Sequence, residues 1–267
     1  MSVSLDPTGQ KAVIGGILDD RHSSIHVVDL VSGKVQNTFT TESFPSIGEV
    51  QWTSDGKSIS FDGLSNQDWT VNTYIWKLGL SSGPQLLAPG IIATWSLDGS
   101  QLATVTPGNS ISITDRSTGN SKVIIAFDKA SKKTIVALDW SPDGNWLVLI
   151  TLGENRGYVS HQLYRIQANG ENLQLLFDDP PQGPILGDAR WIDDGKWMAV
   201  LMGTSGDLGI KFVSADGKFV VEPLKGLKDI AIMDISDDAS RAVVAVGRKL
   251  YSLNILEAIA PLSIQEV

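Results

Sequence analysis

The sequence of 267 residues contains no cysteine and only three histidines. The absence of cysteine excludes disulfides, thiolate metal sites and cysteine nucleophiles. His22 and His26 lie across the junction of an expected loop and strand, where their spacing does not suit two ligands of one metal ion. A chain without free thiols also suits an oxidising compartment. We expect this protein to work outside the cytoplasm, in a periplasm or at a cell surface.

Clustered positive charge is missing as well. The net charge is −9, and no basic run is longer than Lys132-Lys133. Nucleic-acid backbones and anionic membrane surfaces both bind grouped Lys and Arg, so the sequence disfavours both partners. The longest apolar run, Trp146–Leu152, is too short to enter a bilayer as a span. No secretory signal opens the chain, because Val3 already belongs to the first repeat, and we expect a native signal or anchor to lie outside these residues.

The usual marks of an enzyme are also scarce. The sequence has neither a P-loop nor a dinucleotide-binding glycine pattern. Gly203–Gly206 resembles the surroundings of a serine nucleophile, but the strand, sharp turn and helix of that element are not indicated around it. We therefore expect no catalytic residue, no cofactor and no bound metal. The sequence favours a non-enzymatic protein over a free-standing enzyme.

What the sequence does contain is one short phrase, used six times. In most copies a Trp is followed by two or three small or polar residues, then Asp-Gly, then an apolar run. The copies are Leu5–Gly9, Trp52–Gly56, Trp95–Gly99, Trp140–Gly144, Trp191–Gly195 and Ile235–Ala239. Their last residues are separated by 43 to 51 positions. Such a period indicates one supersecondary unit that is repeated along the chain.

The fourth repeat shows what that unit is. Ile135–Trp140 and Trp146–Thr151 are apolar enough for buried strands, and Ser141–Gly144 between them has the residues of a tight turn. His161–Ile166 alternates as a third strand, and Leu173–Phe177 follows an Asn-Gly hairpin turn as a fourth. Four antiparallel strands in each of six repeats predict an all-β fold, a six-bladed β-propeller.

The repeats fill the chain from end to end, which predicts a single domain at residues 1–267. The blades are expected at about residues 1–46, 47–89, 90–133, 134–184, 185–228 and 229–267. A two-sheet sandwich would have no reason to repeat a Trp-to-Gly phrase at one period. The repeated Trp suits a wedge that fills the gap between neighbouring blades.

The phrase Trp140-Ser-Pro-Asp-Gly144, an apolar strand, and then Leu163–Gly170 together resemble the TolB-type propeller repeat. That repeat is also found in the propeller domains of prolyl-oligopeptidase-like peptidases. The resemblance extends over all six repeats and implies a propeller that serves as a binding scaffold. The additional N-terminal domain of TolB and the hydrolase domain of the peptidases have no counterpart in these residues.

The phase of the repeats bears on how the first and last blades meet. The chain starts with a first strand at Met1–Leu5 and reaches a fourth strand at Leu262–Val267. No strand is left over to complete another blade. We therefore expect no interlocked closing blade. A sheet that joined these two strands would contradict this expectation.

Unequal loops point to a candidate binding site. The loops between second and third strands are long in three repeats, at Gly16–Ser24, Gly63–Thr73 and Leu152–Ser160, and loops on a rigid scaffold often carry binding residues. An exposed aromatic residue near Arg is typical of an interaction hot spot. The alternative is that Trp69 folds under its own loop. The candidate binding residues are Arg21, His22, Asp68, Trp69, Arg156 and Tyr158.

A second candidate is the central channel. One polar residue precedes the Trp position in every repeat, and these residues should lie at similar height on the innermost strands. They are Ser4, Gln51, Thr94, Asp139, Arg190 and Asp234. Arg190 is expected between the carboxylates of Asp139 and Asp234. The ring is either a hydrated, salt-bridged lining or a site for a small polar ligand or cation.

These features favour a TolB-like, non-enzymatic scaffold that docks a protein or peptide on its long-loop face. We expect an acidic monomer. The alternative is a propeller domain excised from a prolyl-oligopeptidase-like hydrolase or from a membrane-anchored sensor.

Overall fold

A computed structural model describes most of the chain. The described residues are 2–17, 22–80, 82–106, 108–155, 158–178, 185–192, 195–204, 207–221, 230–236, 240–246 and 249–254. The chain divides into two compact units, Met1–Ala126 and Phe127–Val267. Each unit contains three sheets.

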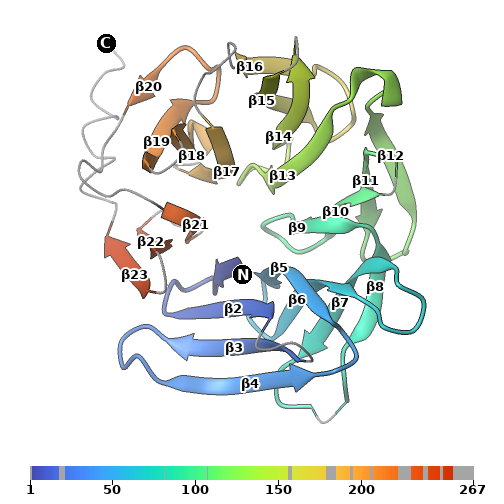
Figure 1. Ribbon diagram of the computed structural model, residues 1–267, viewed down its shortest axis with the longest axis vertical. Coiled ribbons are helices and arrows are strands. Elements are labelled where there is room, and N and C mark those ends of the chain that lie inside the picture. The colour runs from blue at the N-terminus through green and yellow to red at the C-terminus, as the bar shows by residue number, and fades with distance from the viewer. Residues whose placement is uncertain are drawn as a thin grey trace. The chain divides into compact units, whose positions relative to one another are not determined.

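The first unit holds three four-stranded antiparallel sheets. In each sheet the strands pair in chain order, and Figure 1 shows them side by side in that order. The strands are β1 Ser2–Leu5, β2 Lys11–Ile17, β3 Ser23–Asp29, β4 Val35–Thr41, β5 Ser46–Trp52, β6 Ser58–Leu64, β7 Val71–Lys77, β8 Gln85–Pro89, β9 Ile91–Trp95, β10 Gln101–Thr106, β11 Ser110–Asp115 and β12 Ser121–Ala126.

The second unit repeats the pattern with two four-stranded sheets and a third sheet whose described part has three strands. The strands are β13 Thr134–Trp140, β14 Trp146–Asn155, β15 Tyr158–Gln167, β16 Gln174–Asp178, β17 Ile185–Ile192, β18 Trp197–Thr204, β19 Asp207–Ser214, β20 Val220–Val221, β21 Ile230–Ile235, β22 Arg241–Val246 and β23 Lys249–Asn254. A 3-10 turn lies at Lys129–Ser131, before the first strand of the fourth blade. No helix in the described part of the chain could span a membrane.

The six sheets are the blades of a six-bladed β-propeller, as the sequence predicts. At the start of the chain, β1 pairs with β2 inside its own blade. The last expected strand, Leu262–Val267, lies outside the described residues.

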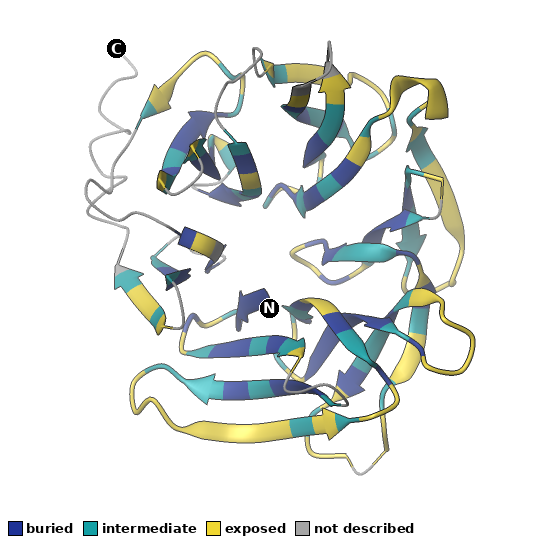
Figure 2. Cartoon of the chain, in the orientation of Figure 1, coloured by how far each residue is buried: buried dark blue, intermediate teal, exposed yellow. Residues whose placement is uncertain are grey.

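Burial changes from strand to strand within each blade. In the second blade, six of the seven residues of β6 are buried. The outer strand β4 of the first blade is almost wholly exposed, and Figure 2 shows it mainly in the colour of exposed residues. The apolar run after the Asp-Gly turn is therefore a middle strand of the blade. Neighbouring blades cover both faces of such a strand, which explains why nearly all its residues are apolar.

The repeated Trp fills the gap between blades, as the sequence predicts. Trp52 packs with Val13 and Ile25 of the preceding blade. The indole N–H of Trp95 donates a hydrogen bond of 3.1 Å to the hydroxyl of Ser60 in the preceding blade. Both Trp side chains are buried. Their large apolar surface therefore holds neighbouring sheets of the first unit together.

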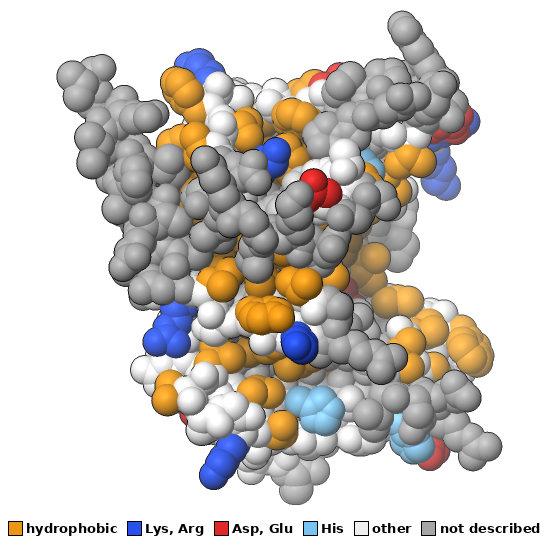
Figure 3. Space-filling view, turned by 60° about the vertical axis from the view of Figure 1, so that its left-hand side comes forward, with side chains coloured by type: hydrophobic (Ala, Val, Ile, Leu, Met, Phe, Trp, Pro, Cys, Tyr) orange, Lys and Arg blue, Asp and Glu red, His pale blue; other side chains and the backbone are white. Residues whose placement is uncertain are grey.

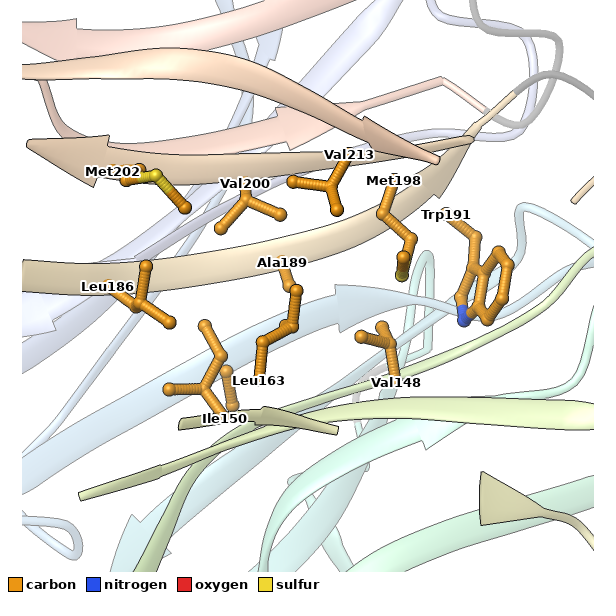
Figure 4. Close-up of a cluster of buried hydrophobic side chains, with 11 residues drawn as sticks. Val148, Ile150, Leu163, Leu186, Ala189, Trp191, Met198, Val200, Met202 and Val213 are labelled. Atoms are coloured by element: carbon orange, nitrogen blue, oxygen red, sulfur yellow. The ribbon is translucent and has the colours of Figure 1, made fainter. Parts of the chain in front are cut away.

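The corresponding gap in the second unit is filled by a larger cluster, drawn in Figure 4. Ile150 of β14 faces Leu186 of β17, and Val148 of β14 lies nearer Trp191, which closes one end of the cluster. None of these four side chains is more than 7% exposed. Close packing of this kind fixes the angle and spacing of the two sheets.

The Asp-Gly phrase forms a self-contained turn. The hydroxyl of Ser141 donates to Asp143 Oδ1 at 2.5 Å and accepts the backbone N–H of Trp146 at 2.8 Å. Gly144 has φ of +69°, a conformation that glycine adopts without steric cost. The same pattern of bonds recurs at Thr53 and Ser96. The hydroxyl before the Asp-Gly pair is therefore a structural part of the repeat.

Replacement of this hydroxyl should weaken the fold. We expect Ser141→Ala to lower the free energy of unfolding by about 1–2 kcal/mol, because the backbone N–H of half-buried Trp146 loses a partner. Urea unfolding followed by tryptophan fluorescence would measure the change. Asn145→Ala, at an exposed position of the same turn, is the matched control and should have a smaller effect. An equal effect of both substitutions would contradict the assigned role of Ser141.

One expected loop is wrong. The sequence predicts a loop at Leu152–Ser160, but β14 continues to Asn155 and β15 begins at Tyr158. The ladder runs from Leu152 opposite His161 to Asn155 opposite Tyr158. Backbone pairing requires no apolar side chains, so polar residues can continue a strand beyond the core. Lys132 Nζ supports this ribbon through a 2.8 Å salt bridge to Glu154.

Candidate functional site

In every blade, one end carries the second-to-third-strand loop and the crossing to the next blade. We call this the loop end, and the opposite end, with its tight hairpins, the turn end. In the first unit the loop after β6 is tied to the crossing after β4. The backbone N–H of Asn66 donates to Ser43 O at 3.1 Å, and Asn66 Nδ2 donates to Glu42 O at 2.9 Å. The two segments therefore form one ordered surface.

Trp69 projects from this surface. Its side chain is 69% exposed, so the alternative that it folds under its own loop is wrong. Its φ is +57°, a left-handed value that is rare for a bulky residue and costs about 1–3 kcal/mol. The backbone N–H of Trp69 donates to Ser65 O at 3.0 Å. The loop thus holds an exposed indole in a strained backbone conformation.

Asp68 fixes the next residue of the loop. One of its carboxylate oxygens accepts the hydroxyl of Thr70 at 2.8 Å and the backbone N–H of Thr70 at 3.2 Å. The hydrogen bond from the Thr70 hydroxyl, followed by that from its backbone, holds the pKa of Asp68 below its usual value. Asp68 therefore presents a negative charge beside Trp69 over the whole neutral and mildly acidic range.

The other predicted loop residues are placed as follows. His22 Nε2 lies 3.1 Å from Glu42 Oε1, which joins His22 to the same surface as Asp68 and Trp69. Tyr158 opens β15 in the second unit. Arg21 and Arg156 lie outside the described residues. The structure therefore brings three of the six predicted residues together, and Glu42 is the member that the sequence analysis missed.

Three of the predicted channel residues bind the following blade. Each accepts a hydrogen bond from the backbone N–H of the next repeat's Trp: Ser4 from Trp52 at 3.4 Å, Gln51 from Trp95 at 3.2 Å and Asp139 from Trp191 at 2.9 Å. Gln51 Nε2 also donates to Thr94 Oγ1 at 3.4 Å. We call the bonds to the Trp backbone N–H groups clasps. They explain why polar residues occupy positions whose neighbours are mostly apolar.

Arg190 and Asp234 form an ion pair in the second unit. Arg190 Nε lies 3.2 Å from Asp234 Oδ1, and Arg190 Nη1 lies 2.7 Å from Asp188 Oδ1. All three side chains are less than one-fifth exposed. The sequence analysis anticipated Asp234 as a partner and missed Asp188. Asp188 lies two residues before Arg190, and residues at that spacing share one face of a strand.

A buried carboxyl at the loop end of the first unit was also missed. Asp62 of β6 accepts the backbone N–H of Ile92 at 2.7 Å and lies 3.1 Å from Thr73 Oγ1. Ile92 has φ of +54°. Burial, opposed by the Ile92 hydrogen bond and assisted by the nearby charge of Glu49, raises the pKa of Asp62 to about 7. The sequence analysis missed this residue because its hydrogen-bond partner Ile92 lies 30 positions further along the chain.

The contacts of Thr73 explain how a neutral Asp62 fits. Its hydroxyl lies 3.1 Å from both Asp62 Oδ1 and Gly90 O, but it has only one proton to donate. If Asp62 carries a proton, the carboxyl donates to Thr73 and Thr73 donates to Gly90. Every group then has a partner. Protonated Asp62 therefore completes the hydrogen bonds that hold the crossing between the second and third blades.

No family model matches the sequence, and no curated protein matches it. Solved structures do. TolB from Acinetobacter baumannii has a TM-score of 0.66 at 16% identity, over 93% of this chain and 62% of that one. The fold is that of the TolB-type propeller. The chain thus spans about three-fifths of the length of that TolB.

Two further solved structures extend the comparison. A structure assigned as TolB from Agrobacterium tumefaciens has a TM-score of 0.60 at 14% identity, over 83% of this chain and 79% of that one. A prolyl endopeptidase has a TM-score of 0.60 at 12% identity, over 96% of this chain and 40% of that one. Similarity at this level of identity establishes the fold, and the same fold carries different activities.

Proposed function

We propose that this chain is a non-enzymatic binding module that docks a protein or peptide at its loop end and works outside the cytoplasm. The observation that carries the proposal is Trp69, a Trp that is 69% exposed on an ordered loop. Trp is among the residues that contribute most to binding energy in protein interfaces. Among the described residues, no group of three or more potential metal ligands lies together.

The test is a selection of peptides from a random display library against the wild-type protein. We expect the enriched peptides to bind Trp69→Ala at least tenfold more weakly, since truncation of a central aromatic residue typically costs 2 kcal/mol or more, about thirtyfold in affinity. Titration by calorimetry would measure the affinities.

Phe219→Ala provides a matched control, because Phe219 is an aromatic residue of similar exposure, 60%, in a turn-end hairpin. This substitution should leave the affinities unchanged. Peptides that bind wild type and Trp69→Ala equally well would overturn the proposal. Circular dichroism of both variants would show that the fold is retained.

The similarity to a prolyl endopeptidase over 96% of this chain and 40% of that one favours a second candidate, a propeller domain of a larger hydrolase. The parent reading frame distinguishes the two. A Ser-Asp-His hydrolase domain encoded after these residues would favour the peptidase, and a lipoprotein signal or membrane anchor before them would favour a binding module or a sensor.

A further inference from the structure

Charges are segregated between the two ends of the first unit. Its six described Lys and Arg residues all lie at the turn end, by their positions in the strands and hairpins: Lys11, Lys34, Lys57, Lys77, Arg116 and Lys122. Five Asp residues lie at that same end: Asp6, Asp29, Asp55, Asp98 and Asp115. The turn end is therefore close to neutral.

The loop end of the same unit carries only acidic charge among its described Lys, Arg, Asp and Glu residues. Glu42, Glu49 and Asp68 lie there, and the fourth carboxyl at this end, Asp62, is buried. The side chain of Glu42 is 73% exposed, more than that of its partner His22. In the space-filling view of Figure 3, the described Lys and Arg side chains form no continuous basic surface. A one-sided field of this kind attracts cations and repels anions.

We propose that the Trp69 surface, formed by Glu42, Asp68 and Trp69, docks a Lys- or Arg-containing extended segment of a partner protein. The indole face accepts a cationic side chain, which is attracted to the negative face of an aromatic ring. The carboxylates of Asp68 and Glu42 accept its hydrogen bonds, and charge-assisted bonds of this type are the strong ones.

The geometry around the three residues supports this assignment. Asp68 and Trp69 are neighbours in one loop, and Glu42 is held against that loop by the bond from Asn66 to its backbone oxygen at 2.9 Å. The same protein shows the chemistry internally, since Arg165 Cζ lies 4.5 Å from the centre of the Trp146 ring. His22 contacts one oxygen of Glu42 and leaves the carboxylate largely exposed.

This inference rests on the proposed function and names the chemistry of the partner. Three synthetic peptides of equal length test it, identical except for four positions that carry Arg, Gln or Glu. We expect the Arg peptide to bind wild type at least tenfold more tightly than the Glu peptide at 50 mM salt. Its affinity should fall when the salt is raised to 200 mM, because salt screens exposed charges.

Variants connect the effect to this surface. Glu42→Gln/Asp68→Asn should weaken the Arg peptide about tenfold and leave the Gln peptide unchanged. Asn at position 68 keeps the oxygen that Thr70 uses. Asp98→Asn/Asp115→Asn removes two charges from the turn end of the same unit, one exposed and one half-buried, and should change the affinity less than twofold.

Two outcomes would overturn the inference. One is equal weakening of the Arg peptide by the loop-end and turn-end double variants, which would reflect net charge alone. The other is equal or tighter binding of the Gln or Glu peptide. If those peptides bind tightly but depend on Trp69, the proposed docking function survives and only the basic chemistry of the partner fails.

Discussion

Asp62→Asn is expected to remove a large pH dependence from the stability of the first unit. The pKa of Asp62 is raised from 3.8 to about 7 in the folded protein. The folded state therefore binds this proton more tightly than the unfolded state. Stability from Asp62 is present in full below about pH 4 and is lost as the pH rises through 7. The whole effect is about 4 kcal/mol, of which about 2–3 kcal/mol falls between pH 5 and 8.

Asparagine at position 62 stays neutral and can still accept from Ile92 and donate to Thr73. Urea unfolding of wild type and Asp62→Asn at pH 5, 6, 7 and 8 should show the variant gaining on wild type at each step. Asp98→Asn is the control, because hydrogen bonds from the backbone and side chain of Ser100 and the side chain of Ser96 lower the pKa of exposed Asp98. Its difference from wild type should stay constant over this range. A constant difference for Asp62→Asn as well would refute the assigned protonation.

The second large effect is expected at Arg190. Arg190→Met should lower the free energy of unfolding of the second unit by about 3–5 kcal/mol at pH 7, because Asp188 and Asp234 lose the charge that compensates them. Arg190→Lys should fall between wild type and Met, since an ammonium group lacks the planar fork that reaches both carboxylates. Chemical unfolding monitored by fluorescence measures all three proteins.

A rescue experiment separates charge from packing. Adding Asp188→Asn and Asp234→Asn to Arg190→Met removes the two carboxylates that Arg190 binds and should restore most of the lost stability. The destabilisation by Arg190→Met alone should also shrink as the pH falls towards 4, because the carboxylates can then be protonated. If the triple variant is as unstable as Arg190→Met, the side-chain contacts of Arg190 matter through packing alone.

The repeat made most of the fold predictable. Trp52, Ser141 and Gly144 act through bonds and contacts that recur in other copies of the phrase, for example at Trp95, Thr53 and Ser96, so the shared phrase predicts them. Loops are different, because a polar stretch such as 153–155 can either leave a sheet or continue its ladder. Local sequence does not decide between these states. Whether the strand continues depends on how well the two opposed segments pair, which is a property of the whole hairpin.

The candidate site was predictable only in part. Trp69 stood out because a large aromatic residue lay between polar neighbours in an expected loop. Glu42 and Asp62 did not, because their roles depend on partners 20 or more residues away, Asn66 for Glu42 and Ile92 for Asp62. The polar residue before each Trp was found by aligning the repeats. Its role as a clasp was not, because the acceptor and the donor belong to different repeats.

The turns and the clasps differ in how far they reach, and this bears on how such a chain can grow. Every bond of the Ser141 turn closes within six residues. A duplicated segment of one repeat would therefore arrive with its turns intact. It would need only an acceptor such as Gln51 or Asp139 in the preceding copy to be attached. Duplication of a whole repeat thus requires only two side chains for its attachment, one acceptor in the preceding repeat and one Trp between the blades. The loops take no part in this attachment and are free to diverge.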